Sequence, residues 1–440
     1  MGLCLGKTSP CPRPDVTPKI AGGCLCPRDP STWSWADLPP EITGLVFSRL
    51  PSHDDRLSLA AVCHDWRLAT QHQRAMLPPA LPYINLGNGV CHGLADGKAR
   101  RFATFRGSYT ASASFGSWLL YEQRGGSGRC FLRAPNSPAI KVPCLYAQRA
   151  LLSATSSIAD TVDMGATSSI ADTLDMGTDV KMVVCSSRLV VAIFRRHTFG
   201  DILPSSGVFK CSNIACFRPA RARAWQLRPA TWSPVSSYDN HRRTSYLYID
   251  IAFFQGKIFA LTTLEELFCY DFFANDRENQ QRIGDRLIKH ATEQRPPRSD
   301  SSYLVVSSDK QKLLMVRWNG IFTTDHQPAM DLRVFEADFD EGQWSEVNDL
   351  AGQALFLSRN CSKAFQAGSL EHCDLGFRGG NCVFVLGNEW AQSWRRPDVC
   401  GDQTSRYLVY DMVSGETSSV TLDGAPCIER FRSGWFFPDE

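Results

Sequence analysis

Side chains that often carry chemistry are numerous in this chain, but their spacing does not match a common reactive site. The 440 residues include 9 histidines and 17 cysteines. No two histidines stand three or four residues apart, the spacing that places two imidazoles on one helix face to bind a metal ion. Cys24 and Cys26 have no second pair at zinc-finger spacing, and Cys211 and Cys216 stand too far apart for a simple knuckle. We therefore expect free thiols, no metal site and no cofactor.

The sequence also lacks the short motifs of common enzyme classes. It contains no phosphate-binding loop, dinucleotide fingerprint, HExxH helix or GxSxG nucleophile elbow. The glycine-rich stretch 125–128 is not followed by Lys-Ser or Lys-Thr, so it predicts a hairpin turn. No catalytic residue is expected. One enzymatic alternative stays open, because a β domain with a central channel can place two carboxylates together there, and sequence alone does not locate such a pair.

Composition indicates a folded soluble protein without strong electrostatic attraction to other molecules. The chain is 43% hydrophobic and 21% charged, and its net charge of +2 predicts neither nucleic-acid nor membrane binding. No run approaches the roughly 18 apolar residues of a membrane helix. The cysteines are odd in number and no apolar leader precedes them, so we expect reduced thiols in the cytoplasm or nucleus. An acylated N-terminus is disfavoured, because Gly6 replaces the expected Ser or Thr.

Three short amphipathic helices are predicted between Trp35 and Leu77. Prolines 39 and 40 suit the first turn of a helix, where a missing N–H leaves no hydrogen bond unmade. Asp54 or Asp55 is expected to cap the second helix. Three short helices bury too small a share of their area to be stable alone. Their apolar faces must therefore pack on the rest of the chain or on another protein. The apolar positions of the first helix are Ile42, Leu45, Val46 and Leu50.

This helical stretch resembles an F-box, the module that binds the Skp-type adaptor of cullin-based ubiquitin ligases. The family pattern appears in order as Leu38-Pro39, then Leu50-Pro51 with Asp54, then residues 62–67, Val-Cys-His-Asp-Trp-Arg. One departure is Thr43-Gly44, where the family usually has two leucines, and the glycine costs the helix roughly 1 kcal/mol relative to alanine. The resemblance implies adaptor contacts, with Trp66 and Leu38 as the expected anchors. The residues expected to bind the adaptor are Leu38, Pro39, Ile42, Val46, Leu50, Val62, Cys63 and Trp66.

From Tyr83 onward the pattern changes to short β-rich runs bounded by turn residues. At least twelve such runs predict an all-β barrel, sandwich or propeller. They are Trp118–Tyr121, Cys130–Arg133, Met182–Cys185, Leu189–Phe194, Tyr246–Phe254, Lys257–Leu261, Leu267–Tyr270, Tyr303–Val306, Leu313–Trp318, Leu332–Phe335, Cys382–Leu386 and Tyr407–Tyr410.

A degenerate repeat favours the propeller. Each unit reads strand, turn, strand and then an aromatic residue next to an acid, with Tyr270, Phe335 and Tyr410 as the aromatic positions. Their steps of 65 and 75 residues fit a kelch-like blade of about 50 residues plus a long loop. The aromatic side chain is expected to fill the gap between blades. A stacked-sheet domain remains the alternative, and the number of blades is left open.

The second half of the chain resembles the F-box-associated β-propeller family of KIB type, found in plants, which pairs an N-terminal F-box with this domain. The resemblance rests on Glu336–Phe339, Trp344, Leu355–Ser362 and the closing Gly434–Pro438, which is similar to the family's last strand. We expect a disordered lead-in at 1–32, an F-box at 33–77, a linker at 78–82 and a propeller at 83–440. Residues 154–177 contain two tandem copies that differ only at Val162 and Leu174, and they predict a duplicated loop.

The F-box resemblance implies a non-catalytic substrate receptor of an SCF-type ubiquitin ligase, with the propeller binding the target and the adaptor linking it to cullin. One alternative is a propeller enzyme or small-molecule binder whose helices pack on the β domain. This alternative predicts that Trp66 and Leu50 are buried and that acids line a channel pocket. Another is an F-box scaffold that acts outside degradation. The target itself is an unknown protein.

Overall fold

The chain folds into three N-terminal helices and six β-sheets in the part that the structure describes. The computed structural model describes residues 35, 38–73, 79–87, 89–102, 108–123, 129–135, 137–143, 178–197, 210–219, 225–227, 248–262, 264–273, 285–288, 301–322, 328–366, 380–386, 406–422 and 433–438. The expected lead-in at 1–32 and the duplicated loop at 154–177 lie outside these ranges. The helical module followed by an all-β domain confirms the predicted fold class.

The helices are α1 (Pro40–Ser48), α2 (His53–Ala60) and α3 (His64–Gln73). Pro39 occupies the N-cap of α1, with Pro40 in the first turn as predicted. The cap of α2 differs from the prediction: Ser52 is the N-cap residue, and its hydroxyl accepts a hydrogen bond from the backbone N–H of Asp55. Asp54 and Asp55 instead lie in the first turn, where a carboxylate stabilises the positive end of the helix.

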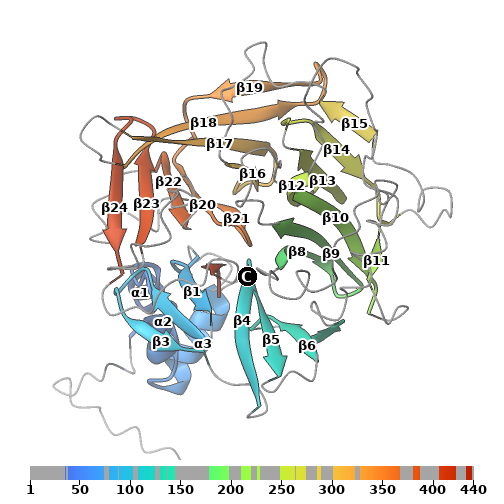
Figure 1. Cartoon of the computed structure of the whole chain (residues 1–440). Helices are drawn as coiled ribbons and strands as arrows, with labels where there is room; N and C mark the ends of the chain where they lie inside the picture. Colours follow the sequence, from blue (N-terminus) through green and yellow to red (C-terminus); the bar gives the residue numbers. More distant parts are fainter. Residues whose placement is uncertain are drawn as a thin grey trace, which may run out of the picture.

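The six sheets are arranged radially as the blades of a propeller (Figure 1). Blade 1 has the strand order β25-β1-β2-β3, and blade 6 has the order β21-β20-β22-β23-β24. Blade 2 consists of β4 to β7, blade 3 of β8 to β11, blade 4 of β12 to β15 and blade 5 of β16 to β19. The strands of blades 1 to 3 are β25 (Gly434–Phe436), β1 (Tyr83–Gly87), β2 (Val90–Gly93), β3 (Ala99–Arg101), β4 (Tyr109–Phe115), β5 (Trp118–Gln123), β6 (Cys130–Arg133), β7 (Ile140–Val142), β8 (Thr178–Ser186), β9 (Leu189–His197), β10 (Lys210–Phe217) and β11 (Gln226–Leu227). Those of blades 4 to 6 are β12 (Tyr248–Phe254), β13 (Lys257–Thr262), β14 (Leu267–Tyr270), β15 (Asp285–Ile288), β16 (Ser301–Val306), β17 (Leu313–Phe322), β18 (Pro328–Asp338), β19 (Gln343–Val347), β20 (Gln353–Leu357), β21 (Ser362–Gln366), β22 (Cys382–Leu386), β23 (Arg406–Asp411) and β24 (Thr417–Thr421).

The sequence pattern locates the middle strands of the blades because both of their faces are buried. All twelve predicted runs are strands, and β6, β14 and β22 have the predicted bounds. In β22 every residue is buried, so the strand reads as a continuous apolar run that stands out in the sequence. Outermost strands such as β3 and β24 are exposed and polar, whereas Ile140 and Val142 of β7 are buried. In β24, for example, no residue is buried, and periodicity did not identify it.

Six hydrophobic clusters fill the spaces between neighbouring blades. The cluster between blades 4 and 5 contains Phe335, and the cluster between blades 3 and 4 contains Tyr270. Tyr410 packs against the cluster between blades 5 and 6. These three aromatic residues lie on β14, β18 and β23 of successive blades, so each repeat step is one blade. The predicted role of the aromatic positions in filling the gaps between blades is confirmed.

The ring closes where the C-terminal strand joins the first blade. Strand β25 pairs antiparallel with β1, so residues at opposite ends of the chain share one sheet. Trp435 of β25 is fully buried, and its indole N–H donates a 2.9 Å hydrogen bond to the carbonyl of Leu357 in blade 6. The strand therefore ties blade 1 to blade 6 and joins the two ends of the chain in one sheet.

Candidate functional site

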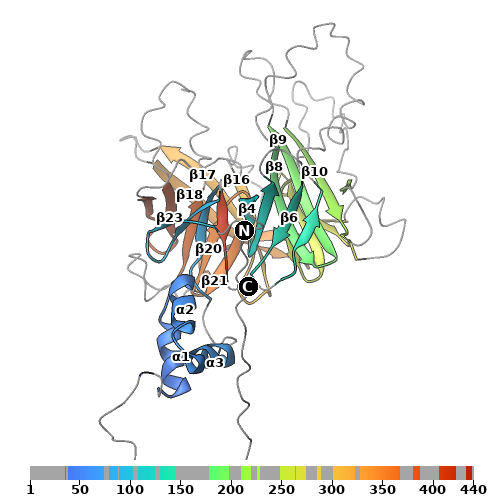
Figure 2. The ribbon, with the colours of Figure 1, turned by 90° about the horizontal axis from the view of Figure 1, so that it is seen from below.

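The three helices project from one face of the propeller (Figure 2). Helix α1 packs against α3 through Thr43, Gly44 and Phe47, and Phe47 is fully buried. The Thr43-Gly44 pair, which departs from the F-box pattern, therefore faces the interior of the module. The opposite side of α1 remains exposed to solvent.

This exposed side of α1 is apolar. Ile42 is 44%, Leu45 is 58% and Val46 is 40% exposed, which is unusual for three large aliphatic side chains within five residues. Leu57 of α2, Val62 in the turn between α2 and α3, and Leu68 of α3 are also exposed. Leu45, Leu57 and Leu68 were not among the predicted adaptor-binding residues, although the helical spacing of the apolar positions already placed Leu45 in the stripe. We call Ile42, Leu45, Val46, Leu57, Val62 and Leu68 the exposed apolar surface of the module.

The remaining predicted adaptor-binding residues differ in exposure. Pro39 is exposed, whereas Leu38, Leu50 and Cys63 are half-buried. Trp66 is only 9% exposed, and its indole N–H donates a 2.9 Å hydrogen bond to the carbonyl of Trp35. The indole ring thus supports the module from inside in this structure. Adaptor contact by these residues stays a prediction.

The module is attached to blade 1 by polar contacts. The N–H of Leu81 donates a 2.8 Å hydrogen bond to the carbonyl of Pro51, which connects the expected linker to the α1–α2 turn. Asp54 of α2 lies 2.9 Å from the guanidinium Nε of Arg100 on β3. Leu81 itself is 2% exposed, so this part of the linker packs against the domain.

Arg100 also forms an ion pair with Asp96, so one guanidinium joins two carboxylates at this junction. Partial burial acts to raise the pKa of Asp96, but the hydrogen bonds from Arg100 and from the backbone N–H of Lys98 outweigh it and hold this pKa below its ordinary value. The same hydrogen bonding to Asp96 raises the pKa of Arg100. Burial, reinforced by the charge of Asp54, raises the pKa of Tyr83 at the start of β1. At neutral pH Asp96 and Arg100 are therefore both charged, and the ion pair between them is intact.

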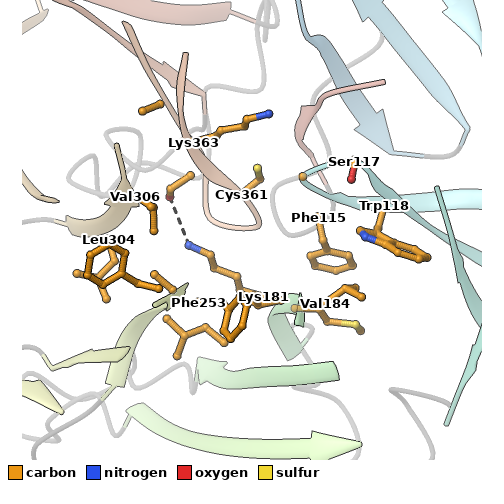
Figure 3. Close-up of a pocket in the computed structure, with 18 of the residues that line it drawn as sticks. Phe115, Ser117, Trp118, Lys181, Val184, Phe253, Leu304, Val306, Cys361 and Lys363 are labelled. Carbon is orange, nitrogen blue, oxygen red and sulfur yellow. Dashed lines mark hydrogen bonds between the residues drawn. The ribbon is translucent and has the colours of Figure 1, made fainter. Parts of the chain in front are cut away.

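A cavity of about 510 Å³ lies at the centre of the propeller, where the inner strands of blades 2 to 6 meet (Figure 3). Its walls include Phe115 and Trp118 from blade 2 and Phe253 from blade 4. The cavity contains Lys181, whose ammonium group pairs with the buried carboxylate of Asp250 at 2.5 Å. Among the described residues that line the cavity, none is an aspartate or glutamate. The pair of convergent acids that a propeller hydrolase would need is not present in this lining.

Most of the described thiols are buried, whereas Cys63 and Cys185 are half-buried. Burial raises the pKa of the Cys91 and Cys185 thiols to about 12, and that of Cys269 and Cys382 to about 11. No group of His, Cys, Asp or Glu in the described ranges is arranged to hold a metal ion. Within the same ranges, no helix has the length and apolar character needed to cross a membrane.

Comparison with family models identifies both parts of the chain. The model of the KIB1-4 beta-propeller matches residues 93–411, which is more than half of the chain. The chain belongs to the KIB1-4 beta-propeller family. A model described as F-box-like matches residues 35–75, the segment that contains the three helices. The resemblance read from the sequence is confirmed for both the F-box and the KIB-type propeller.

Solved structures resemble this KIB1-4 propeller only distantly. The N-terminal domain of Nup159 has 10% identity and a TM-score of 0.28, with 82% of this chain and 81% of that chain covered. BBS1N, solved in complex with ARL6DN, has 8% identity and a TM-score of 0.27, with 80% of each chain covered. BamB from Moraxella catarrhalis has 12% identity and a TM-score of 0.26, with 82% of this chain and 95% of that chain covered. A comparison with curated proteins finds no match.

Proposed function

We propose that this protein is the substrate-recognition subunit of an SCF-type ubiquitin ligase. The observation that carries the proposal is the exposed apolar surface of an F-box-like module: Ile42, Leu45 and Val46 stay in contact with water while the module is folded against the propeller. Burying such side chains on a partner is favourable by roughly 25 cal/mol per Å² of apolar area. A Skp-type adaptor is the partner that the F-box family provides, and through it cullin.

The function of this subunit is to raise the local concentration of the target. The adaptor would bind the helices and the propeller would bind the target, so the transfer of ubiquitin becomes effectively intramolecular. No catalytic residue of this chain takes part in that scheme. The contacts that fix the module on blade 1, from Asp54 to Arg100 and from Leu81 to Pro51, would keep the distance between target and adaptor constant.

The propeller-enzyme alternative has less support. Trp66 is buried, as that alternative expects, but Leu50 is only half-buried and the rest of the α1 stripe is exposed. Its second requirement, convergent acids in the central cavity, is not met by the described lining residues. An F-box scaffold that acts outside degradation uses the same surfaces. It is distinguished by target half-life, which is extended by loss of a ligase receptor and unchanged by loss of a scaffold.

The test is co-purification of the adaptor with the full chain. Ile42→Asp combined with Val46→Asp places two charges on the exposed apolar surface, and we expect it to abolish co-purification. Leu38→Ala with Pro39→Ala, at the start of α1, should also abolish it. The matched control is Val413→Asp, because Val413 is 78% exposed and lies in the β23–β24 turn of the propeller. Adaptor recovery that is equal in all variants would remove the proposal. Imaging of the tagged chain tests the expected cytoplasmic or nuclear location.

A further inference from the structure

The central cavity opens on the face of the propeller from which the helices project. Gly116 lines the cavity, and its carbonyl accepts a 3.0 Å hydrogen bond from the N–H of Phe437. The neighbouring Phe436 pairs with Tyr83 at the start of β1. Two residues earlier, Leu81 is hydrogen-bonded to Pro51 of the helical module. A short series of contacts therefore connects the cavity to the helical module, which projects from one face of the propeller (Figure 2).

The cavity has a positive lining. Three lysines line it, namely Lys181, Lys310 and Lys363, and none of the described lining residues carries a negative charge. Lys181 is neutralised by Asp250 in the interior. Lys310 is exposed in the β16–β17 turn, and the Lys363 ammonium lies 4.4 Å from the centre of the Phe437 ring. An anionic group that enters here meets the exposed Lys310 ammonium and several serine hydroxyls.

The turn that carries Lys310 is held in place by the neighbouring blade. The N–H of Ser308 donates a 2.8 Å hydrogen bond to the side-chain oxygen of Gln353, and the Ser308 hydroxyl is 3.2 Å from the side-chain oxygen of Gln366. Asp309 accepts hydrogen bonds from the Ser307 hydroxyl and from the N–H of Gln311, so its carboxylate is engaged within the turn. Lys310 is therefore presented from a fixed backbone, which lowers the entropy cost of binding.

Aromatic side chains lie beside the cavity at the end of β12, Phe253 on the face of blade 4 toward blade 3 and Phe254 on the face toward blade 5. Phe253 and Phe254 at the end of β12 line the cavity. Phe253 contacts Phe273 at 6.0 Å between ring centres, and Phe254 stacks with Phe339 at 6.3 Å. Phe273 is 48% and Phe339 is 41% exposed, so two phenyl rings remain available to a partner. We call Phe253, Phe254, Phe273 and Phe339 the aromatic ledge.

We propose that the lysine-lined cavity and the aromatic ledge together bind an extended peptide segment of the target, with an acidic residue in the cavity and an apolar residue on the ledge. This proposal rests on the proposed function and adds the chemistry of the target to it. Charge complementarity selects acidic segments over basic ones, and aromatic residues, phenylalanine included, are enriched at protein interfaces. Because cavity and helices share a face, the bound segment lies on the adaptor side of the propeller.

The test measures binding of fluorescent peptides to the purified full chain by anisotropy. The probe contains Leu-Asp-Glu-Asp-Phe within Gly-Ser flanks. Its comparison peptides replace the acids by Lys-Arg-Lys, or the leucine and phenylalanine by glycine. We expect the acidic amphipathic probe to bind at least tenfold more tightly than either comparison peptide. We also expect its affinity to fall as salt is raised, because exposed charges are screened.

Variants assign this binding to the cavity and the ledge. Lys310→Glu combined with Lys363→Glu should lower the affinity for the acidic probe at least tenfold. Phe273→Ser combined with Phe339→Ser should lower it severalfold. The control is Lys141→Glu on the outer strand β7, which makes the same substitution at a single lysine away from the cavity and is compared with each single lysine variant as well as with the pair. Thermal unfolding of each variant confirms that it is folded, and for a lysine variant that does not fold, the pair Lys310→Gln and Lys363→Gln takes its place.

The proposal would be overturned by equal binding of the acidic and basic peptides, or by equal binding of the probe to the lysine variants and to the control. Tight binding of myo-inositol hexakisphosphate without any binding of the acidic probe would also overturn it, because the cavity would then serve a small anion. Adaptor co-purification is measured in the same preparations. If it persists while peptide binding fails, the proposed function stands without this inference. If the adaptor does not co-purify with the unmodified chain, the proposed function fails, whatever the result of the peptide experiment.

Discussion

Lys181 and Asp250 form a buried ion pair that connects four blades at the centre of the propeller. The Lys181 ammonium on β8 donates a 2.5 Å hydrogen bond to Asp250 on β12 and lies 3.4 Å from the Ser362 hydroxyl on β21. The other carboxylate oxygen of Asp250 accepts a 2.8 Å hydrogen bond from the N–H of Leu304 on β16. Both charged side chains are at most 5% exposed. Radial blades contact one another mainly through apolar clusters, so this pair supplies a directional link between them.

Lys181→Met should destabilise the propeller strongly. The substitution keeps the side-chain length but leaves the Asp250 carboxylate buried without its cation, which costs about 3–5 kcal/mol. Urea unfolding followed by tryptophan fluorescence measures this loss. Lys141→Met, at the exposed position of strand β7, should change the free energy of unfolding by about 0.5 kcal/mol or less. A loss below about 1 kcal/mol for Lys181→Met would contradict the structural role given to the pair.

Trp435→Ala tests the closure of the ring. Trp435 is fully buried between blades 1 and 6 and hydrogen-bonded to Leu357, so its truncation leaves a cavity and an unpaired carbonyl. We expect a loss of about 3–5 kcal/mol in the free energy of unfolding. Val413→Ala, on a side chain that is 78% exposed, serves as the control and should be nearly neutral. Comparable stability of the two variants would show that β25 does not close the ring.

Asp54→Ala should loosen the module without unfolding the propeller. The ion pair between Asp54 and Arg100 is partly exposed, so its removal costs about 1 kcal/mol or less. Hydrogen exchange at the amide of Leu81, which is bonded to Pro51, should become up to about fivefold faster. Lys141→Ala leaves this amide unchanged. If exchange at Leu81 does not respond to Asp54→Ala, the ion pair does not hold the module in place.

Acid should weaken the same junction through Asp96. The pKa of Asp96 in the folded chain is below its ordinary value of 3.8, so the folded state favours the carboxylate. The stability it contributes is complete above pH 3.8 and is lost as pH falls below that value toward the lowered pKa. Asp96→Asn should therefore lower the unfolding temperature between pH 5 and 7, and the difference from the unmodified chain should shrink below pH 3.8. A difference that is constant with pH would exclude this role.

Cys63 offers a direct measure of adaptor contact. It is half-buried beside the exposed Val62, whereas Cys91 and Cys382 are at most 4% exposed. Alkylation at pH 8, followed by peptide mass mapping, should modify Cys63 while Cys91 and Cys382 stay unmodified, because burial holds the pKa of these two thiols at about 12 and about 11. A bound adaptor should protect Cys63. Equal labelling of Cys63 with and without adaptor would place it outside the interface.

The sequence by itself determined the fold class, the family and most inner and middle strands. Strands buried on both faces read as continuous apolar runs, and the aromatic positions Tyr270, Phe335 and Tyr410 mark one residue per blade. The F-box pattern could also be recognised in the sequence, because helix spacing and turn residues are local properties. The exposed outer strands carried no comparable signal, since their polar residues resemble those of loops.

Only the tertiary structure decided which apolar residues are exposed and which polar residues meet. Ile42 and Phe47 are both apolar residues of α1, yet one faces water and the other the interior, because α3 covers a single side of the helix. Lys181 and Asp250 stand 69 residues apart in the chain, and Asp54 meets Arg100 across two domains. Such long-range pairs depend on how the blades close into a ring, and ring closure is set by the packing of all six sheets together rather than by any local pattern.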